Sequence, residues 1–256
     1  MNFTLGLLLV ILGLILGSFM AAAIFRLRSK TGGLLTGRSF CANCKNTLQP
    51  IDLIPVVSFL LLRGKCRYCG KPIPRSCLWI EIITALVFLS VGYFTGVGNI
   101  WLLIWQLLFS SVLIFLAAYD SLYGEIPDEV SLPAIAVALL GSFFSFTPSF
   151  ISALLGFLLG ALPFFAIFFF SQGKWMGGGD SRLGGLLGIL LGWQQLLIAI
   201  FLAASCGSIV GLLLIAQNKK QLTSKIPFGP YLAVGGFFTM LFGNLLWNWY
   251  ASNFLF

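Results

Sequence analysis

Histidine is absent from the 256 residues of this chain, and charged side chains make up only 9% of it. Soluble domains carry about a quarter charged residues, so this low proportion excludes an ordinary water-soluble protein. The absence of histidine removes the most common general base and the most common metal ligand. Any catalysis or metal binding must therefore use carboxylates, cysteines or the backbone.

The chain is instead rich in apolar residues, which make up 59% of it, and its charge is strongly basic, with 15 Lys+Arg against 7 Asp+Glu and a net charge of +8. A basic balance can indicate nucleic-acid binding. In a chain this apolar it indicates the positive-inside bias of membrane proteins. We therefore expect a lipid bilayer as partner and no nucleic acid.

The long uncharged segments predict an all-α polytopic membrane protein with about eight transmembrane helices. The first, within residues 1–25, is uncharged and is followed by Arg26 and Arg28, which indicates an anchor with its N-terminus outside rather than a cleaved signal peptide. Residues 77–118 and 130–173 each have room for two spans with a short outer turn.

The remaining spans follow from the side on which the later basic residues lie. Residues 183–218 are uncharged and end at Lys219 and Lys220. Two short spans with a turn near Gly192 keep these lysines on the inner side, as the positive-inside rule requires, and residues 226–256 supply the last span. We expect three parts: the first helix (1–25), a cytoplasmic module (26–77) and a core of seven helices (78–256).

The module between the first two helices contains two C-x2-C pairs, which are Cys41 with Cys44 and Cys66 with Cys69. Each pair can present two thiolates to one ion, so the four cysteines predict a tetrahedral, structural zinc site in a zinc-ribbon-like insertion. The alternatives are two disulfides or four free thiols, and a cytoplasmic location disfavours disulfides. Cys77 and Cys206 stand alone and are expected to be small buried hydrophobic residues.

Two aspartates at the membrane edge are candidates for catalysis. Asp120 follows the apolar run 113–119, and Asp180 follows Gly177 and Gly179 in a Gly-Gly-Gly-Asp sequence. Two carboxylates at one depth can share a proton and activate a water. The local alternative is that Asp180, like Asp128, is a helix N-cap.

Five motifs in order resemble the bacterial type IV prepilin peptidases, which are membrane aspartyl proteases of the GxGD type. They are Gly17-Ser18-Phe19 with Arg26-Leu27; the Cys41 to Cys69 module with Asp52-Leu53-Ile54-Pro55; Asp120 to Asp128; Gly177-Gly178-Gly179-Asp180-Ser181-Arg182-Leu183; and Ile226-Pro227-Phe228-Gly229-Pro230. Arg182 stands where the family usually has lysine.

The resemblance implies that Asp120 and Asp180 are the catalytic pair of an aspartic endopeptidase in the bacterial cytoplasmic membrane, with its active site facing the cytoplasm. The implied substrates are prepilins or pseudopilins, which lose a short basic leader and are then N-methylated with S-adenosylmethionine. Residues 120–182 carry a net charge of −3, and Glu125, Asp128 and Glu129 are expected either to attract that leader or to form a solvated helix start.

Two other function classes fit the sequence less well. A transporter or channel would place carboxylates at several depths, whereas the outer halves of the predicted helices carry no charge. A non-enzymatic scaffold built on the zinc module would leave the two aspartate motifs without a role.

Overall fold

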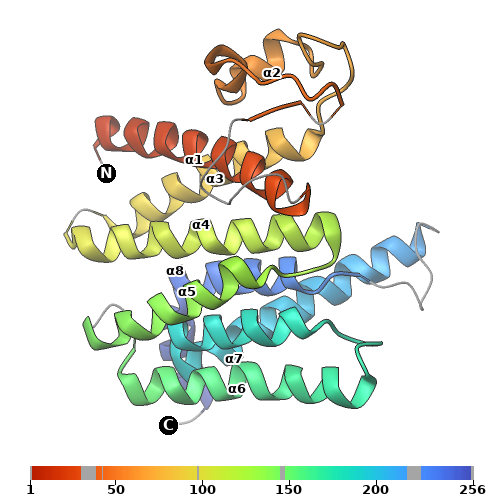
Figure 1. Ribbon diagram of the computed structural model, residues 1–256. Helices are drawn as coiled ribbons and strands as arrows, with labels where there is room; N and C mark the ends of the chain where they lie inside the picture. Colours follow the sequence, from red (N-terminus) through yellow and green to blue (C-terminus); the bar gives the residue numbers. More distant parts are fainter. Residues whose placement is uncertain are drawn as a thin grey trace. The chain divides into compact units, whose positions relative to one another are not determined.

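The computed structural model describes residues 2–29, 39–41, 43–96, 98–144, 148–217 and 226–254, and most of them are helical (Figure 1). Lys219 and Lys220, used above to orient the helices, lie outside these residues. In chain order the elements are α1 (Phe3–Ser29), the 3-10 helix η1 (Pro50–Leu53), α2 (Val57–Leu61), α3 (Arg75–Thr95), α4 (Ile100–Tyr123), α5 (Asp128–Gly141), η2 (Ser142–Phe144), α6 (Phe150–Ser171), α7 (Gly178–Ala216) and α8 (Gly229–Phe254).

Six of the described helices are long and apolar enough to cross a membrane, namely α1, α3, α4, α6, α7 and α8. The predicted all-helical membrane fold is therefore confirmed. The 39 residues of α7 would extend about 58 Å as one straight helix, roughly twice the hydrocarbon thickness. Helix α7 is in fact interrupted at Gly192 (φ 75°, ψ 169°), where the sequence predicted a turn between two spans. The total of eight spans, which also requires the 14-residue α5, stays a prediction.

The chain divides into two compact units, Met1–Leu103 and Ile104–Phe256. The first contains α1, the cysteine module and α3. Its two long helices pack closely because α1 presents glycines to α3: a Cβ at Gly13 would lie 2.7 Å from Cα of Ala85, and one at Gly17 would lie 2.7 Å from Cα of Glu81. Small residues four apart allow such close approach of helices in membranes.

The second unit uses the same device between α6 and α7. A Cβ at Gly156 would overlap the carbonyl of Gly188, and one at Gly160 would overlap the carbonyl of Gly184. Helix α8 packs on α7 as well, where a Cβ at Gly235 would lie 2.5 Å from the carbonyl oxygen of Ala199. These glycines place the first half of α7, which begins with the Gly-Gly-Gly-Asp sequence, in the interior of this unit.

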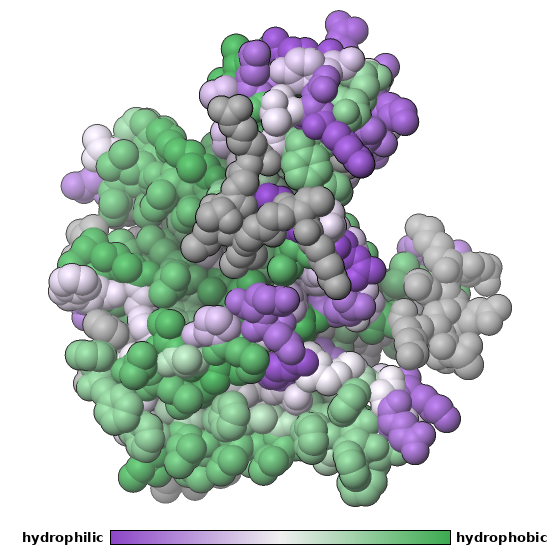
Figure 2. Space-filling view, viewed as in Figure 1, coloured by the Kyte–Doolittle hydropathy of each residue, from purple (hydrophilic) through white to green (hydrophobic). Residues whose placement is uncertain are grey.

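Large apolar side chains cover the outer faces of the helices in both units. Leu8, Trp101, Phe170 and Leu212 are all more than half exposed. Figure 2 shows the apolar residues spread over the helices, whereas hydrophilic residues gather on the cysteine module and the helix ends. An apolar exterior of this extent is stable only in contact with lipid, so the chain is a multi-pass membrane protein.

Candidate functional site

Asp120 lies in the last turn of α4, and its carboxylate is held inside the second unit. Only 5% of the residue is exposed. The helix ends just beyond it because Gly124 adopts a positive φ of 69° and donates its N–H to the Asp120 carbonyl at 2.8 Å. This turn brings Ile126 and Pro127 back into the interior.

Asp180 is the third residue of α7 and is 7% exposed. The helix begins at Gly178, and its N-cap is Gly177, with no side-chain cap hydrogen bond. The alternative interpretation of Asp180 as an N-cap is therefore wrong. Asp128 is not an N-cap either, because Pro127 occupies that position of α5. From the third position of the helix, the Asp180 carboxylate accepts a hydrogen bond from the backbone N–H of Gly177.

Three motifs that are far apart in the chain meet around these two carboxylates. Asp120 and Asp180 are close enough to interact electrostatically. Gly229, at the start of α8, donates a backbone hydrogen bond to Asp120, and a Cβ there would lie 2.5 Å from Oδ2 of Asp120. Ile126 fills the space between the motifs, since a Cβ at Gly179 would lie 2.6 Å from the Cβ of Ile126.

The acidic residues after Asp120 lie at the surface of the same unit. Glu125, Asp128 and Glu129 are exposed. Asp128 forms an ion pair with Arg182, which links the first residue of α5 to the fifth residue of α7. The pair joins the segments that carry the two aspartate motifs.

The four module cysteines converge in the first unit. Their sulfurs all lie within 4.8 Å of one another, and Sγ of Cys41 is 3.9 Å from Sγ of Cys69. Four sulfurs at about 2.3 Å from a tetrahedral zinc ion are about 3.8 Å apart, so small shifts of the side chains would let the cluster hold a metal ion. All six cysteines of the chain are free, and no disulfide joins them.

The two C-x2-C turns repeat one hydrogen-bond pattern. The Cys41 N–H bonds the carbonyl of Asn46 at 2.9 Å, and the Cys66 N–H bonds the carbonyl of Lys71 at 2.8 Å. Lys45 and Gly70 occupy equivalent places with positive φ of 58° and 69°. Burial raises the pKa of the Cys41 thiol, but hydrogen bonds from the Cys44 and Asn43 backbone and from the Cys66 and Cys44 thiols outweigh it and lower this pKa to about 7. Thiolate is the form that binds metal.

Two further carboxylates organise the module. Asp52 accepts hydrogen bonds from Nε of Arg67 at 2.7 Å and from the hydroxyl of Tyr68 at 3.1 Å, which ties η1 to the second cysteine turn. Glu81 of α3 is 8% exposed and accepts the N–H of Val56 at 2.7 Å. Val56 has a positive φ of 60°, a conformation that is costly for a β-branched residue.

Sequence reasoning missed several residues that shape these sites. Gly229 lies within a recognised motif and Glu81 lies outside all five, and no local signal assigned either residue a contact. The pairs Gly13 with Gly17 and Gly184 with Gly188 are small-x-x-x-small patterns that could have been read as helix-packing signals. The expectation of a buried Cys206 is wrong, because this residue is exposed on α7, whereas Cys77 is half-buried.

Comparison with known protein families agrees with the division of the chain into two units, Met1–Leu103 and Ile104–Phe256. Residues 11–95 match the model of the bacterial peptidase A24 N-terminal domain. Residues 107–212 match the model of the type IV leader peptidase family. No solved structure matches the chain.

Curated relatives extend over most of the chain. A prepilin leader peptidase/N-methyltransferase of Aeromonas hydrophila is 34% identical over 226 residues, which cover 87% of this chain and 77% of the relative. A protein of the same name from Bacillus subtilis is 32% identical over 248 residues, covering 96% and 97%. Another from Pseudomonas aeruginosa is 30% identical over 273 residues, covering 95% and 92%. The chain therefore belongs to the type IV leader peptidase family.

Proposed function

We propose that Asp120 and Asp180 are the catalytic pair with which this membrane peptidase cleaves prepilin leaders. The observation that carries the proposal is the burial of both carboxylates within electrostatic reach of each other, at the point where the three motifs of the second unit meet. Two like charges in such a place cannot both ionise at low cost, so they share one proton.

The shared proton gives the pair its chemistry. The ionised carboxylate takes a proton from a water, which attacks the scissile carbonyl, while the protonated carboxyl donates to the carbonyl oxygen. Gly179 and Gly229 have no side chain, which lets Ile126 and the Asp120 carboxylate lie against them. The backbone bonds from Gly177 to Asp180 and from Gly229 to Asp120 hold both groups in place.

The substrate follows from the names of the relatives, which are prepilin leader peptidase/N-methyltransferases, and from the charges near the site. A prepilin has an apolar helix that can lie among the membrane helices and a basic leader. The exposed Glu125, Asp128 and Glu129 attract the leader. The positive-inside rule puts the basic cysteine module on the cytoplasmic side of the bacterial inner membrane, and we propose that cleavage also takes place on the cytoplasmic side.

The metal of the cysteine cluster is zinc, because four thiolates in tetrahedral spacing suit this ion, and four protein ligands leave no open position for catalysis. Zinc then has a structural role, and it fixes the two cysteine turns to each other.

After cleavage the enzyme methylates the new N-terminus, with S-adenosylmethionine supplying a methyl group from its sulfonium. A cavity of about 180 Å³ in the first unit is too small to enclose that whole molecule.

Cleavage of a purified prepilin in detergent tests the catalytic pair. We expect Asp120→Asn and Asp180→Asn each to lower the rate of leader removal by about 10³-fold or more, with the thermal stability unchanged or raised. Glu129→Gln, outside the pair, serves as the matched carboxylate control and keeps at least a fifth of the activity. Near-normal turnover by either aspartate variant would refute the proposal.

A further inference from the structure

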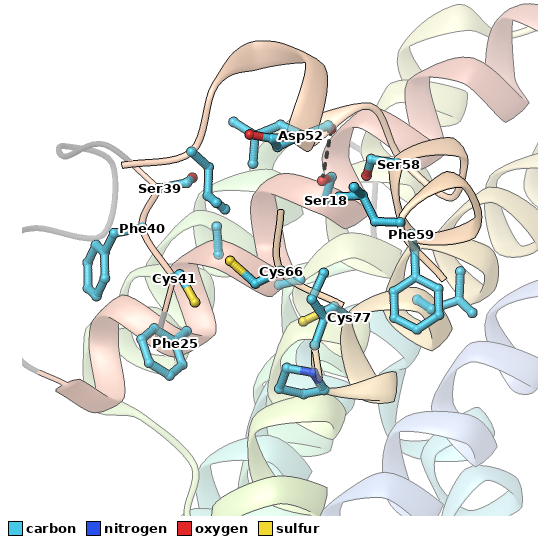
Figure 3. A pocket seen from close by; sticks show the side chains of 18 of the residues that line it. Ser18, Phe25, Ser39, Phe40, Cys41, Asp52, Ser58, Phe59, Cys66 and Cys77 are labelled. Carbon is cyan, nitrogen blue, oxygen red and sulfur yellow. Dashed lines mark hydrogen bonds between the residues drawn. The ribbon is translucent and has the colours of Figure 1, made fainter. Parts of the chain in front are cut away.

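The cavity of the first unit is bounded by α1, the cysteine turns, α2 and the first turns of α3. Figure 3 shows Cys41 and Cys66 of the metal cluster at its wall, with Ser18 of α1, Phe59 of α2 and Cys77 of α3 around it. Phe25 and Phe40 meet edge to face on another wall, with ring centroids 5.9 Å apart. The cavity thus lies directly beside the metal cluster and is lined by aromatic rings.

Glu81 is the carboxylate in this wall that lacks a positive partner. Asp52, the other acidic residue of the lining, is paired with Arg67 at 2.7 Å. Among the described residues no lysine or arginine forms an ion pair with Glu81, which accepts only neutral donors, the Val56 N–H and the Ser18 hydroxyl. Arg26, which also lines the cavity, lies over the ring of Phe19 at 5.7 Å from its centroid.

Burying an ionised carboxylate among neutral partners costs free energy unless a cation binds beside it and balances its charge. The two hydrogen bonds that Glu81 accepts leave part of its acceptor capacity unused, since an ionised carboxylate has about four acceptor sites. An ammonium group has three donors on one compact charge and would fit beside it. Glu81 is therefore in a position to bind a cationic ligand.

The size of the cavity limits which cation enters. A cavity of about 150 Å³ with apolar walls holds a benzene ring, so about 180 Å³ holds one aromatic side chain with its backbone amine. The aromatic walls favour an apolar or aromatic residue. The N-terminus of a peptide satisfies the requirements for positive charge, small size and apolar surface. It presents an amine and one terminal side chain, and no further residue precedes it.

We propose that this cavity receives the N-terminal residue of the cleaved substrate and that Glu81 binds its amine and removes its proton before methylation. The inference rests on the N-methyltransferase activity stated under the proposed function, and it assigns that activity an acceptor site.

The proposed reaction balances in two steps. The carboxylate of Glu81 takes one proton from the ammonium group and leaves a neutral amine with a free electron pair. The nitrogen then attacks the methyl carbon of the sulfonium donor, so an N–C bond forms as the S–C bond breaks, and the donor leaves as a neutral thioether. The methylated nitrogen carries the positive charge, and the proton on Glu81 passes to water as the product leaves.

Glu81→Gln tests the role of the charge with little disturbance of the fold, because the amide oxygen can still accept the Val56 N–H. We expect this variant to remove the leader at the wild-type rate and to methylate at least 100-fold more slowly, by mass spectrometry of the product. Ser90→Ala, a half-buried position on the same helix whose hydroxyl donates to the Leu86 carbonyl of that helix, is the control and keeps both rates.

Binding provides a readout that does not depend on turnover. A synthetic peptide that begins with phenylalanine should bind the wild-type enzyme in detergent, and acetylation of its N-terminus should weaken binding at least tenfold. In Glu81→Gln the free and the acetylated peptide should bind equally weakly. A purely structural role of Glu81 would not make binding depend on the free amine.

Three results would overturn the inference. They are normal methylation by Glu81→Gln, equal binding of both peptides to the wild-type enzyme, and loss of the metal together with methylation in the variant, which would make Glu81 structural. If the wild-type enzyme cleaves but does not methylate, the proposed second activity fails, and peptide binding still decides whether the cavity takes a free N-terminus.

Discussion

Gly229 lies so close to Asp120 that a Cβ at position 229 would be 2.5 Å from Oδ2 of the carboxylate. The first residue of α8 is therefore in direct contact with a residue in the last turn of α4. The third motif, which contains Gly179, reaches the same point through Ile126, since a Cβ at Gly179 would lie 2.6 Å from the Cβ of Ile126 and one at Gly229 would lie 3.4 Å from its Cδ1. The positions of the two carboxylates depend on glycines, which have no side chain, as much as on the helices that carry the aspartates.

Gly229→Ala should lower the rate of leader cleavage by about 10- to 100-fold, because the added methyl group must displace the Asp120 carboxylate and small misplacements of a catalytic group are costly. The rate is measured with a purified prepilin in detergent. Gly98→Ala is the control, since nothing lies within 4 Å of the Cβ it would add. Equal rates for the two variants would contradict the close contact.

Gly179→Ala and Gly178→Ala form a pair of neighbouring substitutions with opposite expectations. A methyl group at 179 would lie 2.6 Å from the Cβ of Ile126, whereas one at 178 would make ordinary contacts of 3.5 Å with the ring of Phe168. We expect the first to lower cleavage at least tenfold and the second to lower it less than threefold. The reverse order in the cleavage assay would show that Ile126 does not position the two motifs.

The α6–α7 contact should depend on Gly188. Its substitution by alanine would place a methyl group against the carbonyl of Gly156, and overpacking of this kind costs about 1–3 kcal/mol of stability. Gly211→Ala, in the second half of the same helix, meets its nearest atom at 3.7 Å and is the control. Thermal unfolding in detergent measures both, and a Gly188→Ala variant as stable as the control would argue against this packing.

One zinc ion per chain is expected by elemental analysis of the purified protein. Cys44→Ser should remove most of it, because three thiolates bind the ion far more weakly than four. Cys206→Ser should keep it, since this residue is on α7, outside the cluster. A protein that folds without bound metal and retains cleavage and methylation would rule out the structural zinc.

Neutralising the acidic surface near the site should weaken substrate binding rather than catalysis. We expect Glu129→Gln to raise KM for a prepilin about two- to fivefold with kcat unchanged, because a single exposed charge contributes little. High salt should raise KM of the wild-type enzyme and reduce the difference between the two proteins. A lower kcat at constant KM would place Glu129 in the reaction instead.

Much of this structure follows from local patterns. The two cysteine pairs converge because each C-x2-C fixes its own turn, and a metal-compatible cluster needs only that the two turns face each other. The interruption of α7 falls at Gly192, where the distribution of charge required the chain to turn and a residue without a side chain allows a positive φ.

Other features depended on contacts between distant segments. From the sequence, an N-cap was the local alternative for both Asp128 and Asp180, yet Pro127 and Gly177 occupy those positions. The pairing of Asp128 with Arg182 and of Val56 with Glu81 also has no local signal, because each joins residues on different elements.

The sequence by itself determined that the chain is a membrane protein, which segments are apolar enough to span the bilayer, and that aspartate and cysteine must supply its chemistry. These properties depend on the amino-acid composition of a segment or on patterns within one helical turn, and both can be read from the sequence. Tertiary structure decided that Asp120, Asp180 and Gly229 meet, and that Glu81 lines a cavity beside the metal cluster. The physical reason is that contacts between residues on different helices depend on how closely the helices approach each other. Glycines on the facing helices set that distance, and the sequence alone does not show which glycines will face each other.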